Sequence, residues 1–189
     1  LIVKNLKIEF LINTILITFS FYLFFITLKD FIVKKYVNLS QNIAHFGFSL
    51  LILSILFNNF FTTEIITNLK VGEKFESKDF KIKFENLYQK NKQNFKSIIG
   101  EFTIENSQGD IEIMKPELRI YNQPNISTSE ADIKTNLLSD KFMTMNIVQN
   151  QEYFNIRYQN KPLMIWIWIS VLFISLSGFI SLFKKKYEN

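Results

Sequence analysis

Residues 36–63, YVNLSQNIAHFGFSLLILSILFNNFFTT, decide the fold, because twenty-eight consecutive positions contain no Asp, Glu, Lys or Arg. Two further runs share this property, residues 10–28 and residues 162–183. A bilayer core of about 30 Å is crossed by about 20 apolar residues in a helix. A helix is required because an isolated strand leaves its backbone groups unpaired in lipid. We therefore predict three transmembrane helices, at about residues 8–28, 40–62 and 162–183.

The net charge of +5 is unevenly distributed along the 189 residues. Residues 64–161 contain fourteen basic and fourteen acidic side chains, so this part of the chain is neutral. The positive surplus flanks the apolar runs, at Lys4, Lys7, Lys29, Lys34, Lys35, Lys184, Lys185 and Lys186. This placement is typical of membrane orientation and argues against nucleic acid as a partner.

The basic residues also predict which side each segment occupies. The loop 29–41 and the tail 184–189 lie on the same side of three spans, and their lysines indicate the inner side. Residues 64–160 then form one extracytoplasmic domain, between a first segment 1–63 and a last segment 161–189. Trp166 and Trp168 are expected in the outer headgroup layer. Pro162 before them suits the first helical turn, where its missing N–H is not needed.

The pattern of residues 64–160 predicts an all-β domain. Phe80, Ile82 and Phe84 alternate with charged residues, as in a half-buried strand. Residues 101–105 and 110–113 alternate likewise, and the intervening NSQG favours a hairpin. Strands are also expected at 142–148 and 152–158, and a loop or a short irregular crossing at 122–135. Five or six short strands predict a small barrel or sandwich inserted between two membrane helices.

His45 is the one histidine of the chain, and it falls inside the second apolar run. Ionisable residues in a membrane helix usually face the bundle interior and are functional. Gln41, His45 and Ser49 recur at helical spacing, so we expect one inward polar stripe. Gly47 leaves space for another helix or for a bulky planar group. His45 is then an interhelical hydrogen-bonding residue, a proton relay or a ligand to haem iron.

The residues that other kinds of functional site require are missing from the sequence. The chain has no cysteine, so disulfides and thiolate metal sites are excluded within it. Five glycines form no phosphate-binding loop. With the sole histidine in the membrane, an external Ser-His-Asp site is excluded as well. We predict no catalytic residue in the outer domain, which is expected to bind or scaffold. Glu117 and Arg119 are expected to form a surface pair.

Four segments together resemble one family in the right order along the chain. They are residues 44–47 (AHFG), 116–121 (PELRIY), 129–133 (SEADI) and 161–168 (KPLMIWIW). The chain resembles the C-terminal part of CcmF-type cytochrome c maturation proteins, over roughly residues 40–183. The tryptophan-rich outer segment and the other histidines of that family are absent. The chain is therefore expected to be the C-terminal portion of a longer protein, truncated or encoded as a separate subunit.

The resemblance implies a component of the haem lyase complex that attaches haem covalently to apocytochrome c. It implies that His45 is an axial iron ligand of a membrane-embedded b-type haem, with the second ligand supplied by a segment outside this chain. The implied partners are the N-terminal part of the lyase, a haem-delivery chaperone and subunits that handle apocytochrome c. The implied location is the bacterial inner membrane with the β domain in the periplasm, or the mitochondrial inner membrane.

Two other functions stay open from the residues alone. A membrane-anchored β domain that scaffolds partners, with His45 purely structural, is the main alternative. A transporter fragment is less compatible, since the spans lack buried carboxylates and Gly/Pro-broken helices. By itself the chain is expected to lack a complete haem site and not to be catalytically complete.

Overall fold

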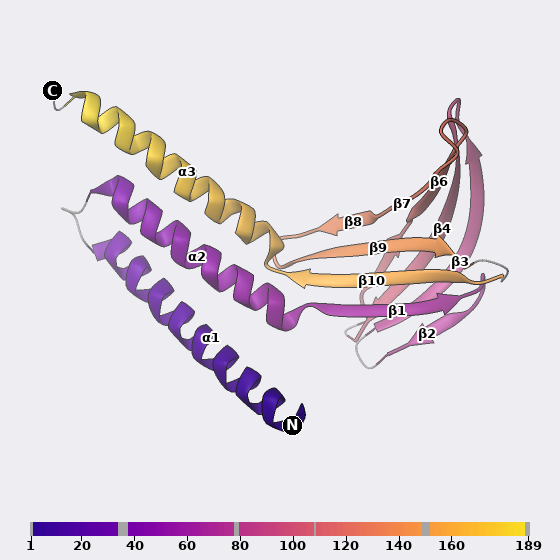
Figure 1. Cartoon of the computed structure of the whole chain (residues 1–189), viewed down its shortest axis with the longest axis horizontal. Coiled ribbons are helices and arrows are strands. Elements are labelled where there is room, and N and C mark those ends of the chain that lie inside the picture. The colour runs from indigo at the N-terminus through magenta and orange to yellow at the C-terminus, as the bar shows by residue number, and fades with distance from the viewer. Residues whose placement is uncertain (1, 34–37, 78–79, 108, 149–151, 188–189) are drawn as a thin grey trace. The chain divides into compact units, whose positions relative to one another are not determined.

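The computed structural model describes residues 2–33, 38–77, 80–107, 109–148 and 152–187, with side chains from Leu11 to Phe183 within these ranges. The chain forms two compact units (Figure 1). The helical unit comprises Leu1–Thr62, Asn136–Ser139 and Lys161–Asn189. The β unit comprises Thr63–Thr135 and Asp140–Asn160. Each unit is described by itself.

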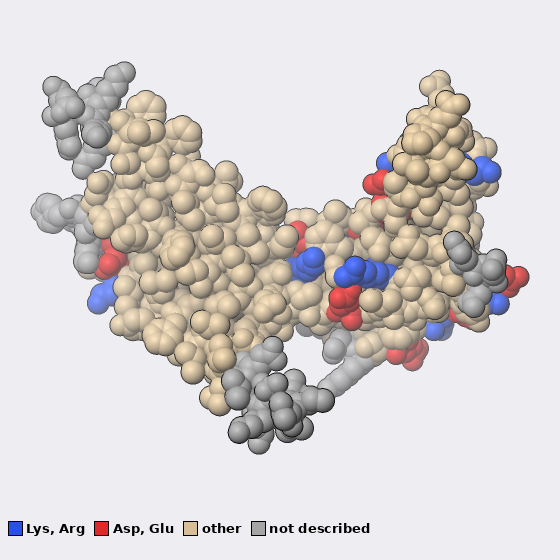
Figure 2. All heavy atoms as spheres, in the orientation of Figure 1, with Lys and Arg blue, Asp and Glu red and all other residues tan. Residues whose placement is uncertain are grey.

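Three helices build the helical unit: α1 (Ile2–Val33), α2 (Leu39–Phe61) and α3 (Met164–Tyr187). Each contains a stretch long and apolar enough to cross a membrane, namely Leu11–Val33, Leu39–Phe61 and Met164–Phe183. The prediction of three membrane helices is confirmed. In Figure 2 the visible face of this unit is uncharged over most of its extent, with a few blue and red spheres at one end. Lys29 and Asp30, expected in a loop, belong to α1.

The prediction for Pro162 is wrong. Pro162 is the last residue of strand β10 (Phe154–Pro162), and α3 begins two residues later at Met164. The intervening Leu163 has a φ of 55°, which turns the chain from strand into helix. The N–H of Leu163 donates to the carbonyl of Leu138 at 2.8 Å, so the turn is fixed by a loop distant in sequence.

Small residues on α2 allow α3 to approach closely. Ser40, Gly47 and Ser54 are buried at heptad spacing on one face of α2. A Cβ added at Gly47 would lie 3.0 Å from Phe173 Cβ and 3.1 Å from Ile174 Cγ1, so α3 occupies the space that the glycine leaves. Packing and interhelical hydrogen bonds drive helix association in lipid. Ser40 supplies such a bond by donating from Oγ to the carbonyl of Ser177 at 2.6 Å.

Aromatic rings and one polar contact join α1 to α2. The hydroxyls of Thr27 and Ser49 lie 2.8 Å apart and are buried. Phe24 packs against Phe46 and Phe21 against Phe57, with ring centroids 5.6 and 5.8 Å apart. The second helix is therefore the central one, in contact with both α1 and α3.

Two antiparallel sheets form the β unit, which is a sandwich. One sheet has the order β1-β10-β9-β8, and the other has the order β2-β3-β4-β6-β7 with β5 also paired to β4. Besides β10, the strands are β1 (Thr63–Leu69), β2 (Lys74–Glu76), β3 (Phe80–Asn91), β4 (Phe95–Asn106), β5 (Ile111–Met114), β6 (Glu117–Tyr121), β7 (Ser127–Glu130), β8 (Asp132–Thr135) and β9 (Ser139–Ile147).

The core of the sandwich follows the predicted alternation. Ile82 and Phe84 of β3 are fully buried, as are Phe102 of β4 and Met145 of β9. Phe84 and Phe102 stack with centroids 4.3 Å apart. Gly100 lies beneath them, where an added Cβ would be 2.6 Å from the Phe102 ring and 2.7 Å from Met145 Sδ. A side chain at position 100 would overpack the core.

The strand predictions are confirmed in part. Strands β3, β9 and β10 overlap those expected, and β4 and β5 form the expected hairpin, with Phe102 opposite Met114. The prediction of a loop at 122–135 is wrong, because β7 and β8 occupy part of it. Their residues are too polar to show alternation, yet β7 pairs with β6 and β8 with β9 through backbone bonds that do not depend on side chains.

The side of the membrane on which each end lies stays a prediction. Lys34 and Lys35 fall outside the described residues. The side chains of Lys4, Lys7, Lys184, Lys185 and Lys186 are likewise outside the described part of the chain. The orientation therefore continues to depend on the charge pattern of the sequence.

We expect Gly47→Leu to separate α2 from α3, because the added side chain overlaps Phe173 and Ile174. Overpacking of this kind costs about 1–3 kcal/mol. Gly178→Leu is the matched control, since an added Cβ there meets nothing within 4 Å. The measurement is the reaction rate of a membrane-permeant thiol reagent with Ser54→Cys, a position 1% exposed on the same face of α2. Gly47→Leu should raise the rate several-fold, and equal rates in both variants would contradict the packing.

Candidate functional site

His45 lies in the second turn of α2 and is exposed, although this helix packs against both α1 and α3. At 100° per residue, His45 is about 160° around the helix from Gly47, on the side opposite the contact with α3. Gln41 and Phe48, one turn to either side, are exposed as well. We call Gln41, His45, Phe48 and Ile55 the open face of α2, since all four are exposed.

The expectation of a single inward polar stripe is wrong. Ser49 is fully buried, and its hydroxyl lies 2.8 Å from that of Thr27 on α1. Gln41 and His45 remain exposed. The three residues share a spacing but span about 80° of the helix circumference, and α1 covers only the Ser49 end of that arc. His45 therefore does not face the interior of the described three-helix bundle.

His45 could provide one ligand to a haem, but the described residues around it form only half of a haem site. An exposed imidazole in an apolar helix is accessible to a planar ligand, and a haem needs one or two axial donors. Among the described residues, no group of three His, Cys, Asp or Glu side chains is close enough together to hold a metal ion. The described helices therefore do not build a zinc site, which needs several such ligands. A haem on His45 would take its second axial ligand and its other wall from polypeptide outside this chain.

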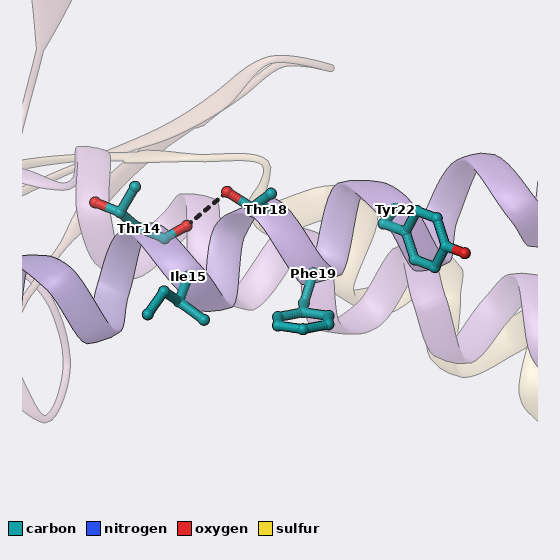
Figure 3. Close-up of a pocket in the computed structure, with 5 residues that line it drawn as sticks. All are labelled: Thr14, Ile15, Thr18, Phe19 and Tyr22. Carbon is teal, nitrogen blue, oxygen red and sulfur yellow. Dashed lines mark hydrogen bonds between the residues drawn. The ribbon is translucent and has the colours of Figure 1, made fainter.

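A separate hollow lies on α1 (Figure 3). It measures about 540 Å³ and is lined by Thr14, Ile15, Thr18, Phe19 and Tyr22. The Thr18 hydroxyl donates to the carbonyl of Thr14 at 2.8 Å, so it is already paired within the helix. All five side chains come from one helix, and none of them is a usual metal ligand. The hollow suits an acyl chain or a neighbouring helix and does not include His45.

The two tryptophans at the start of α3 differ in their surroundings. Trp166 donates its indole N–H to the carbonyl of Leu137 at 2.8 Å, whereas Trp168 is exposed. Both lie within the first five residues of α3. Their position at a membrane interface stays a prediction, but Trp166 has a protein partner that the sequence pattern did not reveal.

Glu117 and Arg119 form the predicted surface pair on β6. Arg119 Nε donates to Glu117 Oε2 at 3.1 Å, and the hydroxyl of Ser97 on β4 donates to the same oxygen at 2.9 Å. Arg119 also lies 3.8 Å from a carboxylate oxygen of Glu130 on β7 and 5.2 Å from the Phe95 ring centroid. The polar residues of the PELRIY segment thus join three adjacent strands.

This network favours the ionised form of the Glu117 carboxyl group. Burial by itself raises the pKa of the carboxyl group, but hydrogen bonds from Ser97 and Arg119 outweigh it, so the pKa lies below its ordinary value of 4.5. Since both partners of Glu117 are neighbours in the sheet, the arrangement holds strands together. The guanidinium of Arg119 is engaged on both sides by carboxylates and is not presented as a free anion site.

The fold and the site together define a class of protein. Three membrane-type helices carry a β-sandwich inserted between the second and the third helix, and one helix presents an imidazole on an open face. This is an integral membrane protein with an extramembrane β-sandwich.

The chain belongs to the family described as "CcmF C-terminal beta-sandwich", whose profile matches residues 60–162. A related protein of Haemophilus influenzae, "Cytochrome c-type biogenesis protein CcmF", is 26% identical over 146 residues, which is 77% of this chain and 22% of the relative. "Cytochrome c-type biogenesis protein CycK" of Bradyrhizobium diazoefficiens is 23% identical over 140 residues, 74% of this chain and 21% of the relative.

A solved structure shares the fold. "Cytochrome c Heme Lyase CcmF" superposes with a TM-score of 0.65 at 13% identity, covering 87% of this chain and 28% of that one. The chain thus spans 22%, 21% and 28% of the lengths of these three proteins. It corresponds to their C-terminal part, as the four sequence segments predicted.

We expect Glu117→Gln to weaken the β unit in a pH-dependent way. A carboxyl group whose pKa is lower in the folded state stabilises the fold above its unfolded pKa. That contribution is lost as the pH falls from the ordinary value of 4.5 through the folded value. At neutral pH the substitution should cost about 1 kcal/mol, a modest value because the side chains of Glu117 and Arg119 are both partly exposed.

Urea unfolding followed by circular dichroism at pH 7 and at about pH 3 measures this difference. The difference in stability between the Gln variant and the parent should be smaller at the lower pH. Glu130→Gln is the control, since its oxygen is farther from Arg119, at 3.8 Å. A loss of stability that is the same at both pH values would contradict the ionic role of Glu117.

Proposed function

We propose that this chain is the C-terminal portion of a cytochrome c maturation haem lyase, in which His45 is one axial ligand of a membrane-embedded b-type haem. The observation that carries the proposal is the exposed imidazole on the open face of α2, in a chain of this family. The relatives that it matches are named for cytochrome c-type biogenesis. The remainder of those longer proteins supplies the polypeptide that would cover the open face.

Several of the described residues would contribute to such a half-site, each in a different way. The imidazole of His45 donates a nitrogen lone pair, which requires its neutral form. Phe48, one turn along the open face, contributes apolar surface near the imidazole, and this would help to keep water from the iron. The contact of α2 with α3 on the opposite side holds the helix, and hence the imidazole, in place. When bound, the haem supplies a one-electron redox centre, which would keep incoming haem reduced.

The position of His45 along α2 also bears on its role. Six residues separate it from Leu39 and sixteen from Phe61, which is about 9 Å and about 24 Å along the helix axis. The β unit follows directly after the Phe61 end of α2. A haem on His45 would thus lie far from the last turn of α2. This position favours a haem that carries electrons, which would reach it from within the membrane or from the opposite side. It disfavours a haem that is itself transferred to apocytochrome c.

The same proposal covers location and partners. The bacterial relatives and the membrane helices favour the bacterial inner membrane. The lysines beside the spans favour a periplasmic β domain. The fully paired network of Glu117 and Arg119 supports a scaffolding role for the sandwich. Its partners would be the N-terminal part of the lyase, a haem-delivery chaperone and the subunits that handle apocytochrome c.

We expect His45→Ala to abolish or strongly reduce the b-type haem absorbance of the complex purified through a tag on this chain. Loss of the imidazole removes an iron bond, and the sequence offers no other histidine and no cysteine to replace it. Maturation of c-type cytochromes in the same cells should fall with it. Gln41→Ala is the matched control, since Gln41 is also exposed and lies one turn away.

Added imidazole should restore part of the absorbance in His45→Ala but change nothing in the control. Haem absorbance and maturation that are both unchanged in His45→Ala would refute the proposal. In that case the chain would be the membrane-anchored scaffold, with a structural histidine.

A further inference from the structure

The loop between β8 and β9 carries two of the most exposed large apolar side chains of the described residues. Leu137 is 64% exposed and Leu138 is 74% exposed. Neither position belongs to a strand, and neither side chain packs in the sandwich core. Adjacent exposed leucines at a loop tip are unfavourable in water, at about 25 cal/mol for each Å² of apolar surface. Their exposure therefore calls for an apolar partner.

This loop is fastened to the beginning of a membrane helix. The residues Asn136–Ser139 cluster with the helical unit. The carbonyl of Leu137 accepts from the indole of Trp166 at 2.8 Å, and the carbonyl of Leu138 accepts from the N–H of Leu163 at 2.8 Å. The membrane-crossing stretch of α3 begins at Met164. The loop is thus held at the level of the first turn of a membrane span.

Most of the backbone N–H and carbonyl groups of the loop are hydrogen-bonded, which suits an environment without water. Asn136 Oδ1 accepts from the N–H groups of Leu138 and Ser139 at 2.9 and 2.8 Å. The N–H of Asn136 donates to the carbonyl of Ser139 at 3.1 Å. Together with the bonds from Trp166 on α3 and from Leu163 just before it, three N–H groups and three carbonyls of these four residues are paired. Unpaired backbone groups are costly in lipid, so this pairing lets the loop enter the edge of the bilayer.

We propose that residues 136–139 form a membrane-inserting loop, whose Leu137 and Leu138 side chains enter the boundary between lipid headgroups and acyl chains beside α3. The occupant is lipid, because the loop is continuous with a membrane span through Trp166 and Leu163. Indole rings favour the same layer. The loop thereby adds a third contact with the membrane surface to the two crossings that flank the β unit, independently of any role of His45.

The absence of cysteine from the chain makes a direct test simple. Leu138→Cys and, separately, Leu137→Cys are labelled with an environment-sensitive fluorophore, and the full chain is reconstituted into phosphatidylcholine vesicles. Ile111→Cys is the matched control in the sandwich, since Ile111 on β5 is 69% exposed. Leu172→Cys in the middle of α3, 61% exposed, is the lipid reference. Unchanged circular dichroism shows that each labelled variant is folded.

Quenching by nitroxide-bearing lipid and by aqueous iodide then shows whether each label lies in lipid or in water. Lipid nitroxide should quench the labels at 137 and 138 several-fold more than the label at 111, and iodide should quench them several-fold less. Iodide quenching equal to that at position 111 would overturn the proposal, because the loop would then lie in water. Protection from both quenchers would also overturn it, because protein rather than lipid would cover the leucines.

Discussion

The structure depends on the close approach of α2 and α3 at Gly47. In lipid the hydrophobic effect does not drive helices together, so contact depends on small residues and interhelical hydrogen bonds. Gly47, Ser40 and Ser54 are small residues of α2, and Ser40 also forms an interhelical hydrogen bond with Ser177. The chain leaves α2 into β1 and returns from β10 into α3, and Thr63 and Asn160 are register partners. The β-sandwich is therefore inserted in the chain between two helices that pack against each other.

The same contact determines which face of α2 remains available. With α3 on the Gly47 side and α1 on the Phe46 and Ser49 side, His45 is left exposed on the remaining arc. An imidazole exposed to acyl chains alone would be a costly feature with no partner. The matched part covers 22% and 21% of the two relatives, so most of each relative lies outside it. We propose that a polypeptide segment like those of the relatives covers His45 and completes the haem site.

The sequence revealed the large features and missed those that depend on contacts distant along the chain. Charge-free runs predicted the three helices, and alternation at Ile82 and Phe84 predicted the strands. The polar strands β7 and β8 carry no such pattern, since backbone pairing alone defines them. The spacing of Gln41, His45 and Ser49 suggested one stripe, but only the packing of α1 shows that Ser49 is buried and His45 exposed. The bond of Trp166 to Leu137 joins residues 29 positions apart, which no periodicity indicates.

Pulsed electron paramagnetic resonance of the oxidised complex can show whether His45 binds iron. A His45→Gly complex, supplied with ¹⁵N-labelled imidazole in place of the missing side chain, should show hyperfine coupling between the iron and the labelled nitrogen. The parent complex should show no such coupling, because its own histidine holds the position. A haem signal that is intact in His45→Gly and unaffected by labelled imidazole would contradict the account.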